Sequence, residues 1–544
     1  MTASPCPTRK RVLLWGLGLL SLLAALALYG FAAWFGTVNQ DEGWYLYASR
    51  LVGEGKMPYR DFFYTQGPVL PYVYGFLESL WSPHGLLGGR LFTALLGILS
   101  AVFTAAMARR AVSPERRGQA GVIAFALIAC NLYQAYFTTL PKTYALAALL
   151  LSAGYWILTF SLPGEEKPSS LASLWALPAG LLIALAAGTR LSLGLLLPIT
   201  TLGLLFTVKR SGMAFFCFAV GGAAGLIAAF GPALIEAREA FVFSQTYHTS
   251  RGGYDLFLIA GSLSRIVRAY LPLGMLVCCV LFFCGLRRKW RPEEEDTARN
   301  GTIWPWIWLA GALSVFTLHL LAPHPYDDYQ VPVMGLLTAT FAAWLVTVVN
   351  ADPVRCRLTA FWVFAALLTA FGSPLAQDWF VSKLDTFWVV RKERPDLVQM
   401  RDTARAVKEL AGEESLLLTQ DLYLAVEAGM RVPEGLEMGP FSYFPALTDE
   451  EAAKYHVMNR KGLLDLLAKA PCRVAAYSGY GWAIRCPEGD RIPTEDRQRF
   501  LSLLGRNYDY VKEIPDFGQN STTLLLLSRR DKTAGKPVQA GKGK

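Results

Sequence analysis

Charged residues are scarce in this sequence: Asp, Glu, Lys and Arg make up 17% of its 544 residues, against roughly 25% in ordinary soluble domains. Histidine occurs only 5 times, and the sequence contains no CxxC pair and no His/Cys cluster with zinc-site spacing. The low charge is not typical of a soluble globular protein, and the missing ligand pattern excludes a zinc-finger type of domain. Internal repeats, which many transporters show, are also missing.

Most of the 9 cysteines lie in apolar runs, where cysteine packs as a small apolar side chain. Cys472 and Cys486 differ, because they belong to the more polar C-terminal part of the sequence. If that part faces an oxidising compartment, these two cysteines could form a disulfide.

Long apolar runs account for the shortage of charge. Hydrophobic residues make up 53% of the chain, its mean hydropathy is +0.32, and ~20 apolar residues suffice to cross a membrane. We predict a mainly α-helical, polytopic transmembrane bundle in residues 1–384, a small α/β domain in residues 385–531 and a disordered tail in residues 532–544. About eleven spans are expected, at residues 12–35, 90–108, 119–137, 142–161, 171–188, 191–208, 213–235, 266–286, 303–322, 331–349 and 358–377.

Basic residues gather in short clusters at the ends of the apolar runs. The net charge of +10 is therefore spread over topology signals and forms no continuous basic stripe, so we expect no nucleic-acid partner. With the N-terminus in the cytoplasm, nearly all clusters fall on the cytoplasmic side. This pattern predicts a multi-pass protein of the plasma (inner) membrane, whose C-terminal domain and loops 36–89, 236–265 and 323–330 lie outside.

The first outer loop, residues 36–89, contains two short amphipathic patterns. One begins near Trp44 and the other follows Pro68, which suits the first position of a helix. Neither is long enough to span a membrane, and both are rich in Trp and Tyr, which favour the headgroup level. We expect two helices along the outer membrane surface.

Two adjacent carboxylates, Asp41 and Glu42, directly follow the first span. At the outer membrane boundary they would be partly desolvated, which suits proton transfer in catalysis. The alternative is structural, because Asn39 as N-cap and Glu42 three residues later form the pattern of a helix-capping box. The residues themselves leave both interpretations open.

Further along the loop, Lys56, Tyr59, Arg60 and Asp61 lie in a turn rich in Pro and Gly. Lys56 or Arg60 could hold an anionic headgroup above the membrane. Alternatively, the segment is a turn that joins the two helices, and Arg60 and Asp61 pair with each other.

Two basic residues lie at the outer ends of spans, Arg190 in a tight hairpin and Lys142 at the start of the fourth span. A cation at membrane depth is costly and indicates a functional site, although either side chain could extend to lipid headgroups instead. We expect a phosphate-binding role for Arg190.

A polar turn at residues 323–330 offers His324, Asp327 and Asp328. These could bind a divalent cation, but three ligands without a fourth are a weak pattern. We therefore predict no metal site, and expect His324, Tyr326 and Tyr329 to line a polar substrate pocket or cap helices.

In this arrangement the chain resembles the GT-C membrane glycosyltransferases, especially bacterial protein O-mannosyltransferase-like and aminoarabinose transferase-like enzymes. The resemblance covers roughly residues 1–350, and the first loop is its specific part. The C-terminal segment from Thr419 to Arg431 is also similar to the family. The matching motifs are Asp41-Glu42, Pro58-Tyr59-Arg60-Asp61, Gly67-Pro68 with Tyr72, Thr189-Arg190, and Tyr326 with Tyr329 and Pro332.

The resemblance implies a sugar donor carried on a polyprenyl phosphate and used at the outer face of the membrane. It implies that Asp41 is the general base of an inverting displacement and that Glu42 positions the acceptor or shares this role. Arg190, helped by Lys142, Lys56 or Arg60, would neutralise the leaving phosphate. The acceptor, whether protein, lipid or glycan, is left open.

One position departs from the family pattern. Many relatives have a second acidic residue where this sequence reads Leu140-Pro141-Lys142-Thr143. A second catalytic acid and a dependence on a divalent cation are therefore not supported, and Lys142 becomes a candidate phosphate contact. The other function classes are a transporter or flippase of lipid-linked saccharides and a non-catalytic assembly subunit. The polar residues favour the transferase, because they gather at the outer boundary and not at the midplane.

Overall fold

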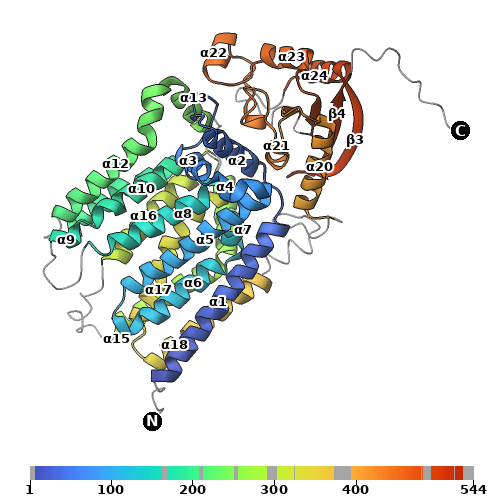
Figure 1. Cartoon of the computed structure of the whole chain (residues 1–544). Coiled ribbons are helices and arrows are strands. Elements are labelled where there is room, and N and C mark those ends of the chain that lie inside the picture. The colour runs from blue at the N-terminus through green and yellow to red at the C-terminus, as the bar shows by residue number, and fades with distance from the viewer. Residues whose placement is uncertain are drawn as a thin grey trace.

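Helices dominate the computed structural model of the chain, which describes residues 7–161, 170–207, 212–249, 255–290, 303–323, 325–372, 394–479, 481, 492–519 and 521–530. The predicted spans form one bundle of roughly aligned helices (Figure 1). The C-terminal helices and strands gather at one end of this bundle, beside the first loop and the C-terminal end of α1. The polar loop and the polar domain therefore share one end of the molecule.

Each of the eleven predicted spans contains at least one helix. Within the described residues, six helices are long and apolar enough to cross a membrane, or up to seven if the pair α14 and α15, bent by 85°, counts as one span. The number eleven thus stays a prediction. The bundle helices are α1 (Pro7–Phe35), α5 (Gly85–Arg110), α6 (Arg117–Ala129), α7 (Leu132–Phe137), α8 (Thr143–Leu158), α10 (Ala176–Thr189), α11 (Leu196–Thr207), α12 (Gly212–Glu236), α14 (Leu256–Ala269), α15 (Leu271–Trp290), α16 (Trp304–Leu320), α17 (Met334–Val348) and α18 (Asp352–Gly372).

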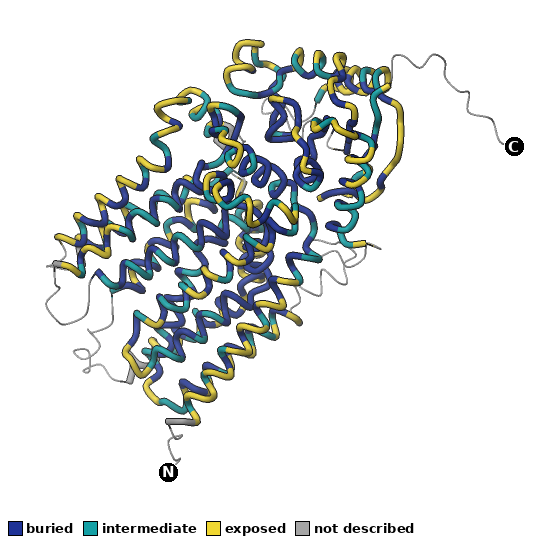
Figure 2. The backbone as a smooth tube through the Cα atoms, in the orientation of Figure 1, coloured by how far each residue is buried: buried dark blue, intermediate teal, exposed yellow. Residues whose placement is uncertain are grey.

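Large apolar side chains cover the outside of the bundle. Trp15 and Leu23 on α1 are 79% and 55% exposed, and Ile227 on α12 is 70% exposed. Figure 2 shows exposed stretches along α1 and α12, while the helices between them are mostly buried. Apolar surface of this extent is typical of contact with lipid and not with water. The chain is a membrane protein.

Both helices predicted in the first loop are present, as α2 (Gln40–Gly53) and α3 (Val69–Phe76). For α2, but not for α3, whose Phe76 is 87% exposed, the expected environment of the aromatic residues needs correction. Trp44, Tyr45 and Tyr47 are at most 4% exposed and do not lie among headgroups. The reason is that α21 (Leu422–Glu427) packs on α2, so closely that a Cβ atom on Gly43 would lie 2.3 Å from the Tyr423 nitrogen.

The C-terminal domain contains a four-stranded sheet in the order β1-β2-β4-β3. Strands β1 (Leu417–Thr419) and β2 (Val474–Tyr477) are parallel, and β4 (Thr522–Arg529) runs antiparallel to β2 and to β3 (Tyr508–Phe517). In the register Ala475 faces Leu527. The helices are α20 (Asp396–Ala411), α21, α22 (Asp449–Lys454), α23 (Arg460–Lys469) and α24 (Thr494–Asn507). The predicted small α/β domain is confirmed.

Strand β3 was not predicted from the sequence. It lies at the edge of the sheet, exposes most of its side chains and contains Pro515, which only an edge strand or a bulge tolerates. Cys472 is a buried free thiol, while Cys486 and the predicted tail, residues 532–544, lie outside the described residues.

Candidate active site

The start of α2 places Asp41 and Glu42 side by side in sequence but in different environments. Asn39 is the N-cap, and its side chain and that of Glu42 form the capping box offered as the structural alternative. The Asn39 nitrogen donates to Glu42 Oε1 at 2.7 Å. Asp41 extends from the first turn and retains 34% of its side-chain exposure. The two carboxylates therefore have separate tasks.

Glu42 is completely buried and is paired with Arg90. Arg90 Nε donates to Glu42 Oε2 at 2.8 Å and Nη2 donates to Oε1 at 2.7 Å. The same guanidinium donates to the carbonyl oxygens of Ala33, Gly36 and Thr37 at 3.2, 2.9 and 3.0 Å. Glu42 and Arg90 thus join the end of α1 to the start of α2. The expected direct contact of Glu42 with the acceptor does not fit a carboxylate without exposed surface.

Asp41 forms an ion pair with Lys142, the N-cap of α8. Lys142 Nζ lies 2.9 Å from Asp41 Oδ2 and 3.7 Å from Asp328 Oδ2, while the lysine side chain is only 7% exposed. Trp44 Nε1 donates to the other Asp41 oxygen at 3.3 Å. One buried ammonium group therefore lies between two carboxylates from distant parts of the chain.

Arg190 lies next to this ion-pair cluster, at the hairpin between α10 and the short helix η3 (Leu191–Leu195). Its guanidinium carbon is 4.1 Å from the centre of the Tyr329 ring and 5.2 Å from that of Tyr144. Tyr144 in turn donates to Asp328 Oδ2 at 2.8 Å. The Arg190 Nε atom is buried without a hydrogen-bond partner among the described residues. Stacking thus fixes the guanidinium while leaving donors available to an anion.

Helix η5 (Asp327–Val333) provides the third side of the site. Asp327 accepts from Tyr133 at 2.6 Å and from Arg265 at 3.1 Å, so it is used in holding η5. Tyr326 is half exposed, and its ring contacts that of Tyr329 at 5.4 Å. The predicted residues Tyr326 and Tyr329 therefore lie beside Arg190, whereas His324 lies outside the described residues.

The turn with Tyr59, Arg60 and Asp61 is not part of the same cluster. Arg60 donates to Asp61 at 2.9 Å and to Glu236, at the end of α12, at 2.7 Å. Tyr59 is buried, and its hydroxyl group donates to the Gln66 carbonyl oxygen. The pairing of Arg60 with Asp61, offered as the alternative to headgroup binding, is present.

Lys56 faces the C-terminal domain. Burial raises the pKa of the Glu437 carboxyl to about 7, and the charge of Lys56 opposes this rise. Of the predicted site residues, the structure brings together Asp41, Lys142, Arg190, Tyr326 and Tyr329. The others, Lys56, Tyr59, Arg60 and Asp61, lie apart from this cluster, where Arg60 contacts α12 and Lys56 faces the C-terminal domain.

Several contacts fix α2 to the C-terminal domain. The Val38 nitrogen donates to Asp396 at 2.9 Å, and the Gln40 nitrogen donates to Gln519 at 2.8 Å. At the other end of the helix, Tyr47 accepts from the Val432 nitrogen at 2.9 Å. The segment from Thr419 to Arg431, which resembles the family, is thus adjacent to the helix that carries Asp41.

Sequence reasoning did not identify Arg90 and gave Asp328 only a possible part in binding a cation. The available signal for Arg90 was a single arginine at the outer end of an apolar span, where a charge is costly. For Asp328 no local pattern could reveal that Lys142, almost two hundred positions away in the sequence, is its partner.

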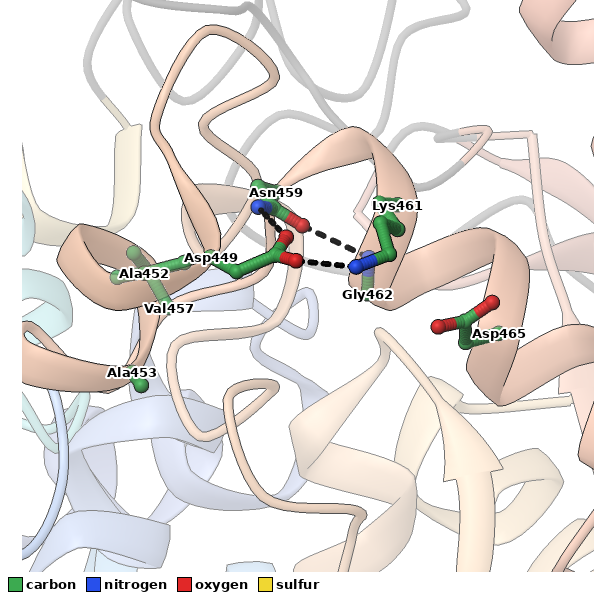
Figure 3. A pocket seen from close by; sticks show the side chains of 8 residues that line it. All are labelled: Asp449, Ala452, Ala453, Val457, Asn459, Lys461, Gly462 and Asp465. Atoms are coloured by element: carbon green, nitrogen blue, oxygen red, sulfur yellow. Dashed lines mark hydrogen bonds and ion pairs between the residues drawn. The ribbon is translucent and has the colours of Figure 1, made fainter.

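A separate hollow lies on the C-terminal domain, and Asp449, Asn459 and Lys461 are among its lining residues (Figure 3). Asn459 donates to Asp449 Oδ1 at 2.9 Å, and Lys461 pairs with the second oxygen. Both oxygens of Asp449 are therefore engaged within the hollow, and no predicted site residue lines it.

No protein-family model and no curated protein sequence matches the chain. Solved structures do match. ArnT from Cupriavidus metallidurans bound to undecaprenyl phosphate has a TM-score of 0.56 at 13% identity, covering 94% of this chain and 98% of ArnT. Its apo structure gives a TM-score of 0.59 at 14% identity, with the same coverage.

A second similar structure is the archaeal oligosaccharyltransferase AglB from Archaeoglobus fulgidus in complex with an inhibitory peptide and a dolichol-phosphate. Its TM-score is 0.52 at 10% identity, covering 97% of this chain and 75% of AglB. Identities this low establish the architecture and not the activity. The chain has the fold of the GT-C membrane glycosyltransferases, as its first loop predicted.

Proposed function

We propose that this protein is a glycosyltransferase that moves a sugar from a polyprenyl phosphate to an acceptor at the outer face of the plasma (inner) membrane. The observation that carries the proposal is the position of Asp41. It is a partly exposed carboxylate beside two fixed cations, Lys142 and Arg190, at the end of a membrane bundle with the GT-C fold. The ArnT structure with undecaprenyl phosphate and the AglB structure with dolichol-phosphate support the donor class.

In the proposed reaction the acceptor atom attacks the anomeric carbon of the donor sugar while its proton passes to Asp41. The bond between that carbon and the phosphate oxygen breaks, and the polyprenyl phosphate leaves with the electron pair. A single displacement of this kind inverts the anomeric centre. Arg190 stabilises the charge that develops on the phosphate, which is the electrostatic part of catalysis.

Asp41 and Arg190 lie at opposite ends of one connected group of side chains. Asp41 contacts Lys142, which lies within ion-pair distance of Asp328, and Asp328 accepts from Tyr144, over whose ring Arg190 lies. An acceptor at Asp41 and a phosphate at Arg190 would flank a sugar between them. Tyr326 and Tyr329 would form the wall of this pocket.

The proposal is tested with the full-length protein in native membranes supplied with radiolabelled undecaprenyl-phosphate sugars, one sugar at a time. Asp41→Asn keeps the shape but removes the base, and a general base contributes ~10²- to 10⁴-fold to rate. The matched control is Glu54→Gln, which alters a carboxylate at the other end of α2 that pairs with Arg431. A transfer rate that is equal in wild type and Asp41→Asn would refute the assigned base.

The outer location has its own test. Arg60 is exposed in the first loop, so Arg60→Cys provides a labelling site that is compared with the parent protein and its native cysteines. A membrane-impermeant maleimide added to intact cells is expected to label this position. Labelling only after the cytoplasmic side is opened would contradict both the topology and the proposed direction of the reaction.

A further inference from the structure

The Lys142 ammonium group occupies a position that elsewhere would suit a divalent cation. It lies between Asp41, in the first turn of α2, and Asp328, in the first turn of η5. Carboxylate oxygens converging from separate segments are the usual ligands of Mg²⁺, Mn²⁺ and Ca²⁺. Here a side chain of the protein itself fills the position.

The residues present do not fit a metal ion. Among the described residues no group of three or more His, Cys, Asp and Glu side chains could hold one. A divalent ion at Asp41 and Asp328 would meet the ammonium charge at a few ångström, and Lys142 is too deeply buried to move into water. An ammonium group buried in this way needs anionic partners, and the Asp41 and Asp328 carboxylates lie 2.9 and 3.7 Å from Lys142 Nζ.

We propose that Lys142 is a built-in cation that takes the place of a divalent metal ion in this transferase. This inference rests on the proposed function, since it concerns the charge balance of the same site. Two carboxylates, Asp41 and Asp328, bring two negative charges, and the two cations Lys142 and Arg190 neutralise them. The ammonium has three N–H donors, so it can bind both carboxylates and still donate to a donor phosphate.

The built-in cation has a chemical consequence. A metal ion must be acquired from solution, and chelators remove it. The Lys142 charge is covalently attached and cannot be exchanged. Asp328 helps to keep the ammonium close to Asp41, because its Oδ2 atom, which accepts from the Tyr144 hydroxyl group, lies 3.7 Å from Lys142 Nζ.

The test is Mn²⁺ binding to the full-length protein in lipid nanodiscs after treatment with a chelator, followed by electron paramagnetic resonance. Wild type is expected to bind no Mn²⁺ up to about 1 mM. Lys142→Asp removes the ammonium and adds a third carboxylate, so it is expected to gain one site with a dissociation constant of about 10⁻⁴ M. Lys142→Met is the matched control, because it removes the charge without adding an oxygen ligand and should gain no such site.

Two further measurements keep the inference open to refutation. Adding Asp328→Asn to Lys142→Asp should abolish the new site, which identifies Asp328 as a ligand. If Lys142→Asp does not fold, the melting temperature of wild type decides, since neither EDTA nor Mn²⁺ should shift it. Tight binding of one Mn²⁺ by wild type, or a folded Lys142→Asp protein without a site, would overturn the inference. These outcomes need no transfer activity, so they are distinguishable from failure of the proposed function.

Discussion

Two groups of ion pairs lie in or beside the first loop and contain the same kinds of side chain. In the Arg60 group, Arg60 pairs with Asp61 and Glu236, and all three side chains are 30–46% exposed. In the Lys142 group, Asp41 and Asp328 pair with a lysine that is 7% exposed. Pair distances of 2.7–3.7 Å do not distinguish the groups. Burial does.

The difference matters because the energetics of the two groups diverge. An exposed ion pair contributes about 0–1 kcal/mol to stability. A buried ion costs several kcal/mol of desolvation before any pairing, and apolar residues of similar size are often as stable. Stability alone therefore explains the Arg60 group but not the Lys142 group. A buried cation beside a partly exposed carboxylate is better explained by function.

The largest expected effect concerns the buried ion pair of Arg90 with Glu42, which lies next to Asp41 in the sequence. Glu42→Gln leaves the Arg90 guanidinium buried without a carboxylate, and removing one partner of a buried pair costs about 3–5 kcal/mol. We expect a clear fall in melting temperature and faster proteolysis within residues 36–44. Arg90→Met should destabilise the protein more than Glu42→Gln, because the carbonyl groups of Ala33, Gly36 and Thr37 also lose their hydrogen-bond donor. Equal stability of Glu42→Gln and wild type would mean that burial does not determine what an ion pair contributes to the stability of this protein.

Arg190→Gln is expected to reduce transfer by ~10²- to 10³-fold, the usual loss when one stabiliser of developing charge is removed. Because Arg190 is held mainly by Tyr144 and Tyr329, the melting temperature should change little. The measurement is the transfer rate at saturating donor together with the thermal unfolding curve. Arg190→Lys serves as the control that keeps the charge but loses the stacking. A variant that unfolds without any change in rate per folded molecule would make Arg190 a purely structural residue.

Asp421 offers a buried carboxylate in the C-terminal domain to compare with both groups. Burial raises its pKa from 3.8 to about 6, although the Tyr423 hydroxyl group, 2.7 Å from its Oδ1, favours the charged form. The folded state therefore holds this proton more tightly than the unfolded state, so the contribution of Asp421 to stability is greatest below pH 4 and is lost as pH rises to about 6. The loss is at most about 3 kcal/mol.

Asp421→Asn should remove this part of the pH dependence. The measurement is the melting temperature of the full-length protein between pH 4 and pH 7.5 for both forms, with Asp402→Asn, an exposed residue of α20, as control. Parallel curves for wild type and Asp421→Asn would contradict the assignment.

The smallest effect is expected in the Arg60 group. Arg60→Gln removes two exposed ion pairs, so stability should change by less than about 1 kcal/mol, and the transfer rate should change less than about twofold. The rate is measured with the same radiolabelled donors. A tenfold loss of transfer with unchanged folding would mean that Arg60 acts in substrate binding, as the sequence suggested. The two groups would then not differ in function.

Much of the architecture could be predicted from the sequence, because apolar runs and amphipathic periods are local patterns. Helices α2 and α3, the membrane bundle and three of the four strands follow from them. Strand β3 escaped prediction because it is an exposed edge strand without an apolar alternation.

The site was only partly predictable. Asp41, Lys142 and Arg190 stood out because charge at the end of an apolar run is unusual. Their arrangement was not visible, because the pairing of Lys142 with Asp328 joins segments far apart in the chain. The same limit applies to Glu42, whose partner Arg90 lies beyond the whole first loop. Adjacent residues Asp41 and Glu42 therefore looked equivalent until their distant partners were known.

The attachment of α2 to the C-terminal domain has a consequence for the synthesis of the protein. The nitrogen atoms of Val38 and Gln40 are held by Asp396 and Gln519, which the ribosome adds 358 and 479 residues later. The helix that carries Asp41 is therefore synthesised early but acquires the second of these contacts only after Gln519 has been added. A nascent chain that stalls before this stage therefore has an α2 that lacks at least the second contact.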